Sequence, residues 1–274
     1  MTTGKDIPLP ALSGWVVILG ASSGFGEAAA LTFARAGCNI IGVHLDRRAT
    51  LPNVERIAAA VRETGREAWF FNINAADAEK RAEVLDEIRR RFAERGQSEQ
   101  VRVLLHSLAF GTLRPFISES TADQVTAKQM DMTLDVMAHS LVYWVQDLLT
   151  RRLLSDEGRI FAMTSTGSTS VWRGYGAVSA AKSALESHVR QLCLELGPRG
   201  ITANAVCAGV TNTPALKKIP DNDTMTEVAI RKNPSHRLTE PLDVARALVA
   251  LAQPCTYWLN GNVLYVDGGE GHSG

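Results

Sequence analysis

Short apolar runs alternate with longer amphipathic segments along most of this chain. The apolar runs are rich in β-branched residues, as buried strands of a parallel sheet are. They lie at Trp15–Leu19, Asn39–His44, Glu67–Phe71, Val101–Ser107, Arg159–Thr164, Thr202–Val206 and Asn262–Val266. The segments between them have helical periodicity and lie at Phe25–Ala36, Asn53–Glu63, Ala78–Arg95, Ala122–Leu154, Gly176–Leu196 and Leu242–Leu251. This alternation predicts a doubly wound α/β fold, a seven-stranded parallel sheet with helices on both faces.

The organisation of the chain is simple. We find no internal repeat and no linker, so one domain over residues 1–274 is the economical interpretation. Residues 1–13 precede the first predicted strand as an N-terminal extension. The segment Thr211–Arg237 contains scattered acids and three prolines, which predict an irregular loop.

Three glycines follow the first predicted strand, in Gly20-Ala21-Ser22-Ser23-Gly24-Phe25-Gly26. A strand, a glycine-rich turn and a helix N-terminus in this order are the context of a dinucleotide-binding loop. The glycines allow a tight turn, a close approach to a pyrophosphate and close packing of helix on strand. Free N–H groups at the helix N-terminus attract phosphate. We therefore expect NAD(P) to contact Gly20, Ser22, Ser23, Gly24, Phe25 and Gly26.

The end of the second predicted strand is where the adenosine ribose binds in such folds. An acid there favours the free 2′-hydroxyl of NAD, whereas arginines favour the 2′-phosphate of NADP. The segment Gly42-Val-His-Leu-Asp-Arg-Arg48 contains both kinds of residue. His44 at the strand end should contact the cofactor, but a neutral imidazole neither repels nor requires a phosphate. With Arg47 and Arg48 beside it we favour NADPH, with NADH possible. A solvated loop explains Arg47 and Arg48 equally well.

Tyr175 and Lys182 lie near the start of the helix that follows the fifth strand. Their spacing is close to two helical turns, so both side chains lie on one face. A phenol with a pKa near ~10 is a weak acid, and a nearby ammonium lowers that pKa. Tyr175 is then a plausible proton donor to an oxyanion that hydride addition creates, with Lys182 beside it. The bare pair also fits a surface tyrosine and a solvated lysine, but its place downstream of a dinucleotide loop argues for the active site.

Composition excludes several classes of function. Lys plus Arg and Asp plus Glu both total 29, so the net charge is zero and no basic excess marks a nucleic-acid or membrane surface. No apolar run approaches the ~20 residues of a membrane helix, and residues 1–13 lack the apolar core of a signal peptide. The four cysteines form no CxxC pair and lie at no metal-ligand spacing. We expect reduced thiols, no metal and a cytoplasmic location.

Together these motifs resemble the short-chain dehydrogenase/reductase superfamily, which has a Rossmann-type fold, over residues Gly14–Gly269. Ordinary members have Tyr-x-x-x-Lys, but here Val178 stands at that tyrosine position. Six residues separate Tyr175 from Lys182, which is typical of enoyl-acyl-carrier-protein reductases. Further features similar to those enzymes are His106-Ser107-Leu108-Ala109-Phe110, Cys207-Ala208-Gly209, and Met137 in place of the usual helix asparagine.

Two features depart from most enoyl reductases. The glycine loop is of the ordinary G-x-x-x-G-x-G type, and Ser165 stands where most of them have a second tyrosine. This combination resembles a divergent NADPH-dependent branch of enoyl reductases that keeps the ordinary loop. The segments Gly111–Pro115 and Asn212–Lys218 also look like that branch. The resemblance implies fatty-acid synthesis as the pathway and reduced sensitivity to triclosan.

The resemblance implies reduction of a trans-2-enoyl thioester, carried on acyl carrier protein or coenzyme A. Tyr175 would donate a hydrogen bond to the thioester oxygen, and Lys182 would orient the nicotinamide ribose. Ser165 would either assist catalysis or order its loop. Further cofactor contacts are implied at Asn72, Ile73, Ser107, Leu108, Ala109, Ala208, Gly209, Val210 and Thr213. Residues 211–237 would form a lid over the acyl chain, and the superfamily's helix packing implies a homotetramer.

Two other interpretations compete with the enoyl reductase. The first is an ordinary carbonyl reductase of 3-oxoacyl thioesters or hydroxysteroids, against which the Tyr175–Lys182 spacing and Met137 argue. The second is a non-catalytic nucleotide-binding regulator, which the intact Tyr175 and Lys182 disfavour.

Overall fold

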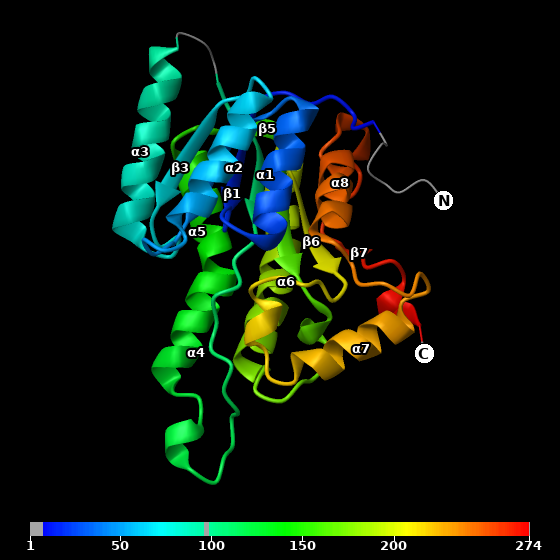
Figure 1. Cartoon of the computed structure of the whole chain (residues 1–274). Helices are drawn as coiled ribbons and strands as arrows, with labels where there is room; N and C mark the ends of the chain where they lie inside the picture. The colour runs from blue at the N-terminus through cyan, green and yellow to red at the C-terminus, as the bar shows by residue number, and fades with distance from the viewer. Residues whose placement is uncertain (1–7, 96–98, 274) are drawn as a thin grey trace.

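The structure, a computed structural model, describes residues 8–95 and 99–273. The first seven residues of the predicted N-terminal extension lie outside that range. Seven parallel strands form one sheet in the order β3-β2-β1-β4-β5-β6-β7 (Figure 1). They are β1 (Trp15–Leu19), β2 (Asn39–His44), β3 (Ala68–Asn72), β4 (Val101–His106), β5 (Leu154–Thr164), β6 (Thr202–Ala208) and β7 (Val263–Val266). The predicted doubly wound α/β fold is confirmed.

Helices cover both faces of the sheet (Figure 1). They are α1 (Gly24–Ala36), α2 (Leu51–Glu63), α3 (Ala78–Glu94), α4 (Ala127–Leu134), α5 (Ser140–Thr150), α6 (Gly176–Leu196), α7 (Asn222–Lys232) and α8 (Pro241–Leu251). Side chains alternate between the faces along each strand. Trp15, Val17 and Leu19 of β1 therefore pack with α3, α5 and α6, whereas Val16 and Ile18 pack with α1, α2 and α8.

The strand order reverses at β1, which pairs with β2 on one side and β4 on the other. The loop after β1 and the loop after β4 lead to opposite sides of the sheet. A crevice therefore opens between these two loops at the carboxyl ends of the strands. The backbone closes the base of this crevice. Gly20 N–H donates to the carbonyl of Val43 at 2.8 Å, and Ser107 N–H donates to that of Leu19 at 2.9 Å. The turns after β1, β2 and β4 are thus held at one edge of the sheet.

One predicted helix is divided in the structure. The sequence predicts a continuous helical stretch over Ala122–Leu154, but α4 begins only at Ala127. There Thr126 and Gln129 form a capping box, in which each side chain accepts the other's backbone N–H. A π-turn over Asp135–His139 then separates α4 from α5. Because β5 already begins at Leu154, the predicted strand from Arg159 is also too short.

The segment Thr211–Arg237 is more regular than its sequence predicts. It contains a 3-10 turn at Leu216–Lys218 and the helix α7. Only Ala229 of α7 is buried, so the helix lacks the apolar stripe by which periodicity identifies helices. Whether this segment covers an acyl chain stays a prediction.

A buried histidine joins β4 to α5. His106 is fully buried, and its Nε2 lies 2.9 Å from Oγ of Ser140, which donates to the carbonyl of Val136. Since that hydroxyl proton is used, Ser140 accepts from Nε2–H, and the imidazole is neutral. Its Nδ1 has no hydrogen-bond partner among the described residues. Burial, and then the charge of Lys182, lower the pKa of His106 to about 3.

This histidine predicts a pH-dependent stability. An unfolded chain binds a proton at His106 near pH 6.5, whereas the folded chain does so only near pH 3. Between these values the unfolded state binds more protons, so the free energy of unfolding falls as the pH falls, by up to about 1.4 kcal/mol per pH unit. Urea unfolding at about pH 7 and about pH 5.5 measures this loss. A His106→Asn variant should lose about 1 kcal/mol less than the unsubstituted chain over that interval; equal losses would contradict the assignment.

Candidate active site

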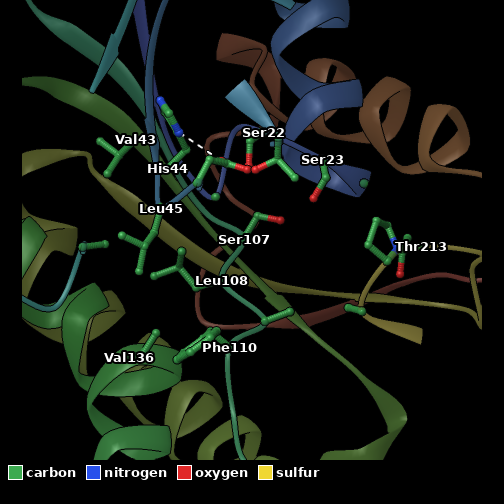
Figure 2. A pocket seen from close by; sticks show the side chains of 18 of the residues that line it. Ser22, Ser23, Val43, His44, Leu45, Ser107, Leu108, Phe110, Val136 and Thr213 are labelled. Carbon is green, nitrogen blue, oxygen red and sulfur yellow. Dashed lines mark hydrogen bonds and ion pairs between the residues drawn. The ribbon is translucent and has the colours of Figure 1, made fainter. Parts of the chain in front are cut away.

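A cavity of about 670 Å³ opens at the carboxyl ends of β1, β2 and β4. Its size is that of a small-molecule or cofactor site, and its place is the crevice where the strand order reverses. Figure 2 shows the side chains that converge on it from the turns after β1, β2 and β4. Predicted cofactor residues that line it are Gly20, Ser22, Ser23, Gly24, Phe25, His44, Ile73, Ser107, Leu108, Ala109 and Thr213.

The glycine turn between β1 and α1 leaves no room for side chains. A Cβ at Gly20, whose φ is +90°, would lie 2.4 Å from the carbonyl oxygen of Ser107. A Cβ at Gly26 would lie 2.0 Å from that of Gly20. Gly26 does not line the cavity; it lets α1 pack against the turn. The helix N-cap, Ser23, makes no side-chain cap hydrogen bond, so the first N–H groups of α1 are available to an anion. These residues fit the diphosphate of a dinucleotide.

Asp46 lines the cavity after β2, a residue that the sequence-based site omitted. Its Oδ2 lies 3.0 Å from Nδ1 of His44, and its backbone exchanges two hydrogen bonds with the Asn72 side chain, at 2.9 and 3.0 Å. Burial raises the pKa of Asp46, but hydrogen bonds from Thr50, Ser22 and His44 outweigh it and leave the pKa below its usual value. The cavity therefore presents a fixed, ionised carboxylate.

The predicted arginine contacts are not found at this end of the cavity. Arg47 and Arg48 follow Asp46 in the chain but do not line the cavity. Asp46 and Ala49, on either side of them, do line it. Asn72 does not line it either and instead holds the backbone of Asp46, while Ile73 does line it. Asp46, Arg47 and Arg48 are consecutive, so their spacing in the sequence cannot show which of them lines the cavity.

Of the three predicted catalytic residues, Ser165 and Tyr175 meet between β5 and α6, while Lys182 contacts β5 separately. Tyr175 is the N-cap of α6, and its hydroxyl lies 3.5 Å from Oγ of Ser165, at the end of β5. Lys182 is buried, and its Nζ donates to the carbonyl of Met163 at 2.7 Å. Tyr175 packs in a cluster with Leu108 and Met132, both of which also line the cavity. This cluster therefore joins Tyr175 to two lining residues, although Tyr175, Ser165 and Lys182 do not line the cavity themselves.

The electrostatics of Tyr175 differ from the sequence-based expectation. A nearby ammonium was expected to lower its pKa, but burial raises the pKa above 10, and the hydrogen bond with Ser165 offsets this only in part. The ammonium of Lys182 is directed to Met163 instead. Burial also lowers the pKa of Lys182, to about 8. Near neutral pH the site therefore holds a protonated phenol and a largely charged ammonium.

Apolar side chains occupy the place one helical turn before Lys182. Val178 is buried in a cluster with Met137 and Ala181. A Cβ at Gly111 would lie 2.8 Å from Val178, from Met137 and from Thr133, so the loop after β4 closes tightly over this point. Valine has no hydroxyl, so residue 178 cannot act as a hydrogen-bond donor. The phenol at the start of α6 is therefore that of Tyr175.

The loop after β6 reaches the cavity through Thr213, whereas Ala208, Gly209 and Val210 do not line it. The backbone N–H of Val210 instead donates to both carboxylate oxygens of Glu270, at 3.2 and 3.1 Å. Glu270 was not among the predicted site residues. It follows the terminal Val266-Asp-Gly-Gly269 motif, and no sequence pattern predicts its contact with a residue 60 positions earlier.

A family model described as Enoyl-(Acyl carrier protein) reductase matches residues 20–270, nearly the whole chain. It spans the glycine turn, the Ser165–Tyr175–Lys182 group and the loop after β6. The chain belongs to the short-chain dehydrogenase/reductase superfamily. It is thereby an oxidoreductase of the family that uses NAD(P)H.

Relatives of this short-chain dehydrogenase/reductase cover almost all of it. An uncharacterized oxidoreductase of Mycobacterium tuberculosis is 29% identical over 92% of this chain and 90% of its own length. The 3-oxoacyl-[acyl-carrier-protein] reductase FabG of Aggregatibacter actinomycetemcomitans is 29% identical over 94% of this chain and 99% of its own.

Solved structures share the fold. A short-chain dehydrogenase/reductase from Serratia marcescens superposes with a TM-score of 0.80 at 23% identity, covering 96% of this chain and 99% of its own. The angucycline C-6 ketoreductase LanV with bound NADP also has a TM-score of 0.80, at 22% identity, covering 95% of this chain and 98% of its own.

Within residues 8–95 and 99–273, no helix combines the length and apolarity needed to cross a membrane.

The glycine turn generates a testable prediction for this short-chain dehydrogenase/reductase. A Gly26→Ala substitution drives a methyl group into the Gly20 carbonyl, so α1 must move away from the turn. We expect dinucleotide affinity, measured by nicotinamide fluorescence, to fall more than about tenfold, because the helix N-terminus loses its place at the diphosphate.

Gly65→Ala is the matched control. It also introduces a methyl group at a glycine, with a φ of +76°, but nothing lies within 4 Å of the added Cβ. It should cost about 1 kcal/mol of stability and leave affinity unchanged. Equal affinities for the two variants would contradict the role of Gly26.

Proposed function

We propose that this chain reduces the conjugated double bond of a trans-2-enoyl thioester with a nicotinamide dinucleotide. The observation that carries the proposal is the placement of the phenol. Tyr175 lies at the N-terminus of α6 beside Ser165, while buried Val178 fills the position from which ordinary members offer their tyrosine. In a ketone the carbon that receives hydride bears the oxygen, but in an enoyl thioester the two are separated by two further carbon–carbon bonds. A donor displaced along the helix suits the second geometry.

The residues of this chain have separate parts in the proposed reaction. A dinucleotide held at the glycine turn would supply a hydride to the β-carbon of the substrate. As the double-bond electrons shift, negative charge would collect on the thioester oxygen, where the protonated Tyr175 hydroxyl stabilises it by a hydrogen bond. A proton from solvent would then add to the α-carbon and complete the addition of two hydrogens. In this proposal Ser165 orients the phenol, and Lys182, held by the carbonyl of Met163, orients the nicotinamide ribose. In this proposal the substrate is carried on acyl carrier protein or coenzyme A, and the enzyme is a cytoplasmic homotetramer.

Carbonyl reduction is the second candidate, and a specific observation favours it. Two of the similar proteins have names that state an activity on 3-oxoacyl or keto groups, the reductase FabG and the ketoreductase LanV. These names support the carbonyl alternative better than the enoyl proposal. The Ser165–Tyr175 pair also offers two hydroxyls to one ketone oxygen.

A substrate pair separates the two candidates. The chain should oxidise NAD(P)H with crotonyl-coenzyme A at least about tenfold faster than with acetoacetyl-coenzyme A. A Tyr175→Phe variant should lose at least about 100-fold in kcat on the preferred substrate, because the oxyanion loses its donor. Tyr257→Phe, an exposed tyrosine remote from the cavity, is the control and should retain full activity. Turnover of the ketone alone would refute the enoyl proposal, and an active Tyr175→Phe would refute the mechanism.

The cavity also supports a proposal on the cofactor. The sequence favoured NADPH through Arg47 and Arg48, but Asp46 is the charged group that lines the cavity after β2. Its carboxylate would accept a ribose 2′-hydroxyl and repel a 2′-phosphate. We therefore propose that NADH is preferred.

An Asp46→Asn variant tests this preference. Removing the negative charge should raise kcat/KM for NADPH relative to NADH by about tenfold or more, because the repulsion of the 2′-phosphate is lost. An Asp156→Asn variant makes the same change of charge at an exposed residue that does not line the cavity and should leave the ratio unchanged. A wild-type preference for NADPH would restore the original expectation.

A further inference from the structure

The end of the chain contacts the loop that follows β6. Glu270 belongs to a short 3-10 turn, Glu270–His272, and its side chain is buried. Both of its carboxylate oxygens accept the backbone N–H of Val210. Three residues later the same loop delivers Thr213 to the cavity. The carboxylate thus fixes the backbone immediately before the loop enters the cavity wall.

The space around this contact is filled. A Cβ at Gly209 would lie 2.7 Å from Oε2 of Glu270 and 2.4 Å from Oγ1 of Thr239. Thr239 and Thr211 are both buried, and the Thr211 hydroxyl donates to the carbonyl of Gly209 at 2.9 Å. Polar groups therefore enclose the backbone of residues 209–211 closely.

The turn that carries Glu270 is itself braced. Asp267 accepts the N–H groups of Gly269 and Gly271 at 2.9 and 2.8 Å. Its carbonyl accepts Nδ2 of Asn233, at 2.9 Å, and Asn233 directly follows α7. A continuous set of hydrogen bonds thus runs from the end of α7, through Asp267 and the terminal turn, to the loop after β6.

Burying the carboxylate of Glu270 costs desolvation free energy. Burial raises the pKa of Glu270, which the Val210 N–H opposes, while the nearby charge of Asp267 raises it further. An ionised group in such a place costs free energy that an apolar residue would not. What the carboxylate provides in return is a strong acceptor with two oxygens, which an apolar side chain cannot supply.

We propose that Glu270 is a positioning residue for the dinucleotide, because it fixes the Gly209–Thr211 backbone just before the loop supplies Thr213 to the cavity. The inference rests on the proposed function, in which a nicotinamide dinucleotide binds in the cavity that Thr213 lines. A loop already fixed before binding loses less conformational entropy when the cofactor arrives. Glu270 therefore increases cofactor affinity without touching the substrate.

Titration of NADH and NADPH by nicotinamide fluorescence, without any thioester, tests the inference. Glu270→Ala leaves the Val210 N–H without its acceptor, and the Kd for the preferred dinucleotide should rise about tenfold. Glu270→Gln retains an amide oxygen as acceptor, and its Kd should stay within about threefold of wild type. His272→Ala is the matched control, since His272 is an exposed residue of the same turn whose ring lies beside Tyr265, and it should bind as wild type does.

Thermal unfolding of the same variants separates positioning from support of the fold. A Glu270→Ala variant with a lower Tm and an unchanged Kd would overturn the inference, since Glu270 would then only stabilise the chain. A folded Glu270→Gln variant as weak as Glu270→Ala would also overturn it, because an acceptor is still present. Failure of the proposed function appears elsewhere, as dinucleotide binding by the wild type with no turnover of the enoyl thioester.

Discussion

The close contact of backbone with backbone at Gly20 and Gly26 is the constraint on which the site depends. A methyl group at either position would lie within 2.4 Å of a carbonyl oxygen, so two turns and a helix meet with no side chain between them. This contact lets α1 begin directly at the cavity, with its N-terminal N–H groups free. It also brings the end of β4, with Ser107 and Leu108, to the opposite wall. The absence of two β-carbons thus lets free helix N–H groups, which favour an anion, face the cavity.

Much of this arrangement could be predicted from sequence because it is encoded locally. The strands are short apolar runs, and the glycine turn has its own spacing. Tyr175 and Lys182 share a helix, so their relation follows from helical geometry. Ser165 joins them because β5 ends beside the start of α6, which the order of elements already implies.

The features that the sequence could not predict depend on the direction in which a side chain points, or on contacts between residues far apart in the chain. Asp46 and Arg47 are neighbours in the chain, and only the fold determines that the carboxylate faces the cavity. The contact of Glu270 with Val210 joins residues far apart in sequence, without a periodic pattern. The pKa of Tyr175 was misjudged for a similar reason. Spacing places Lys182 near the phenol, but the ammonium donates to the carbonyl of Met163, and burial then dominates the pKa.

That raised pKa bears on the part that the proposal gives to Tyr175. In the proposed reaction, a protonated phenol donates a hydrogen bond to an oxygen that gains negative charge. Burial raises the pKa of Tyr175 and so favours the protonated phenol, while the ammonium of Lys182 donates to the carbonyl of Met163. Lys182, with a pKa of about 8, stays largely charged near neutral pH. Burial of Tyr175 therefore suits a hydrogen-bond donor, which is the role that the proposal assigns to it.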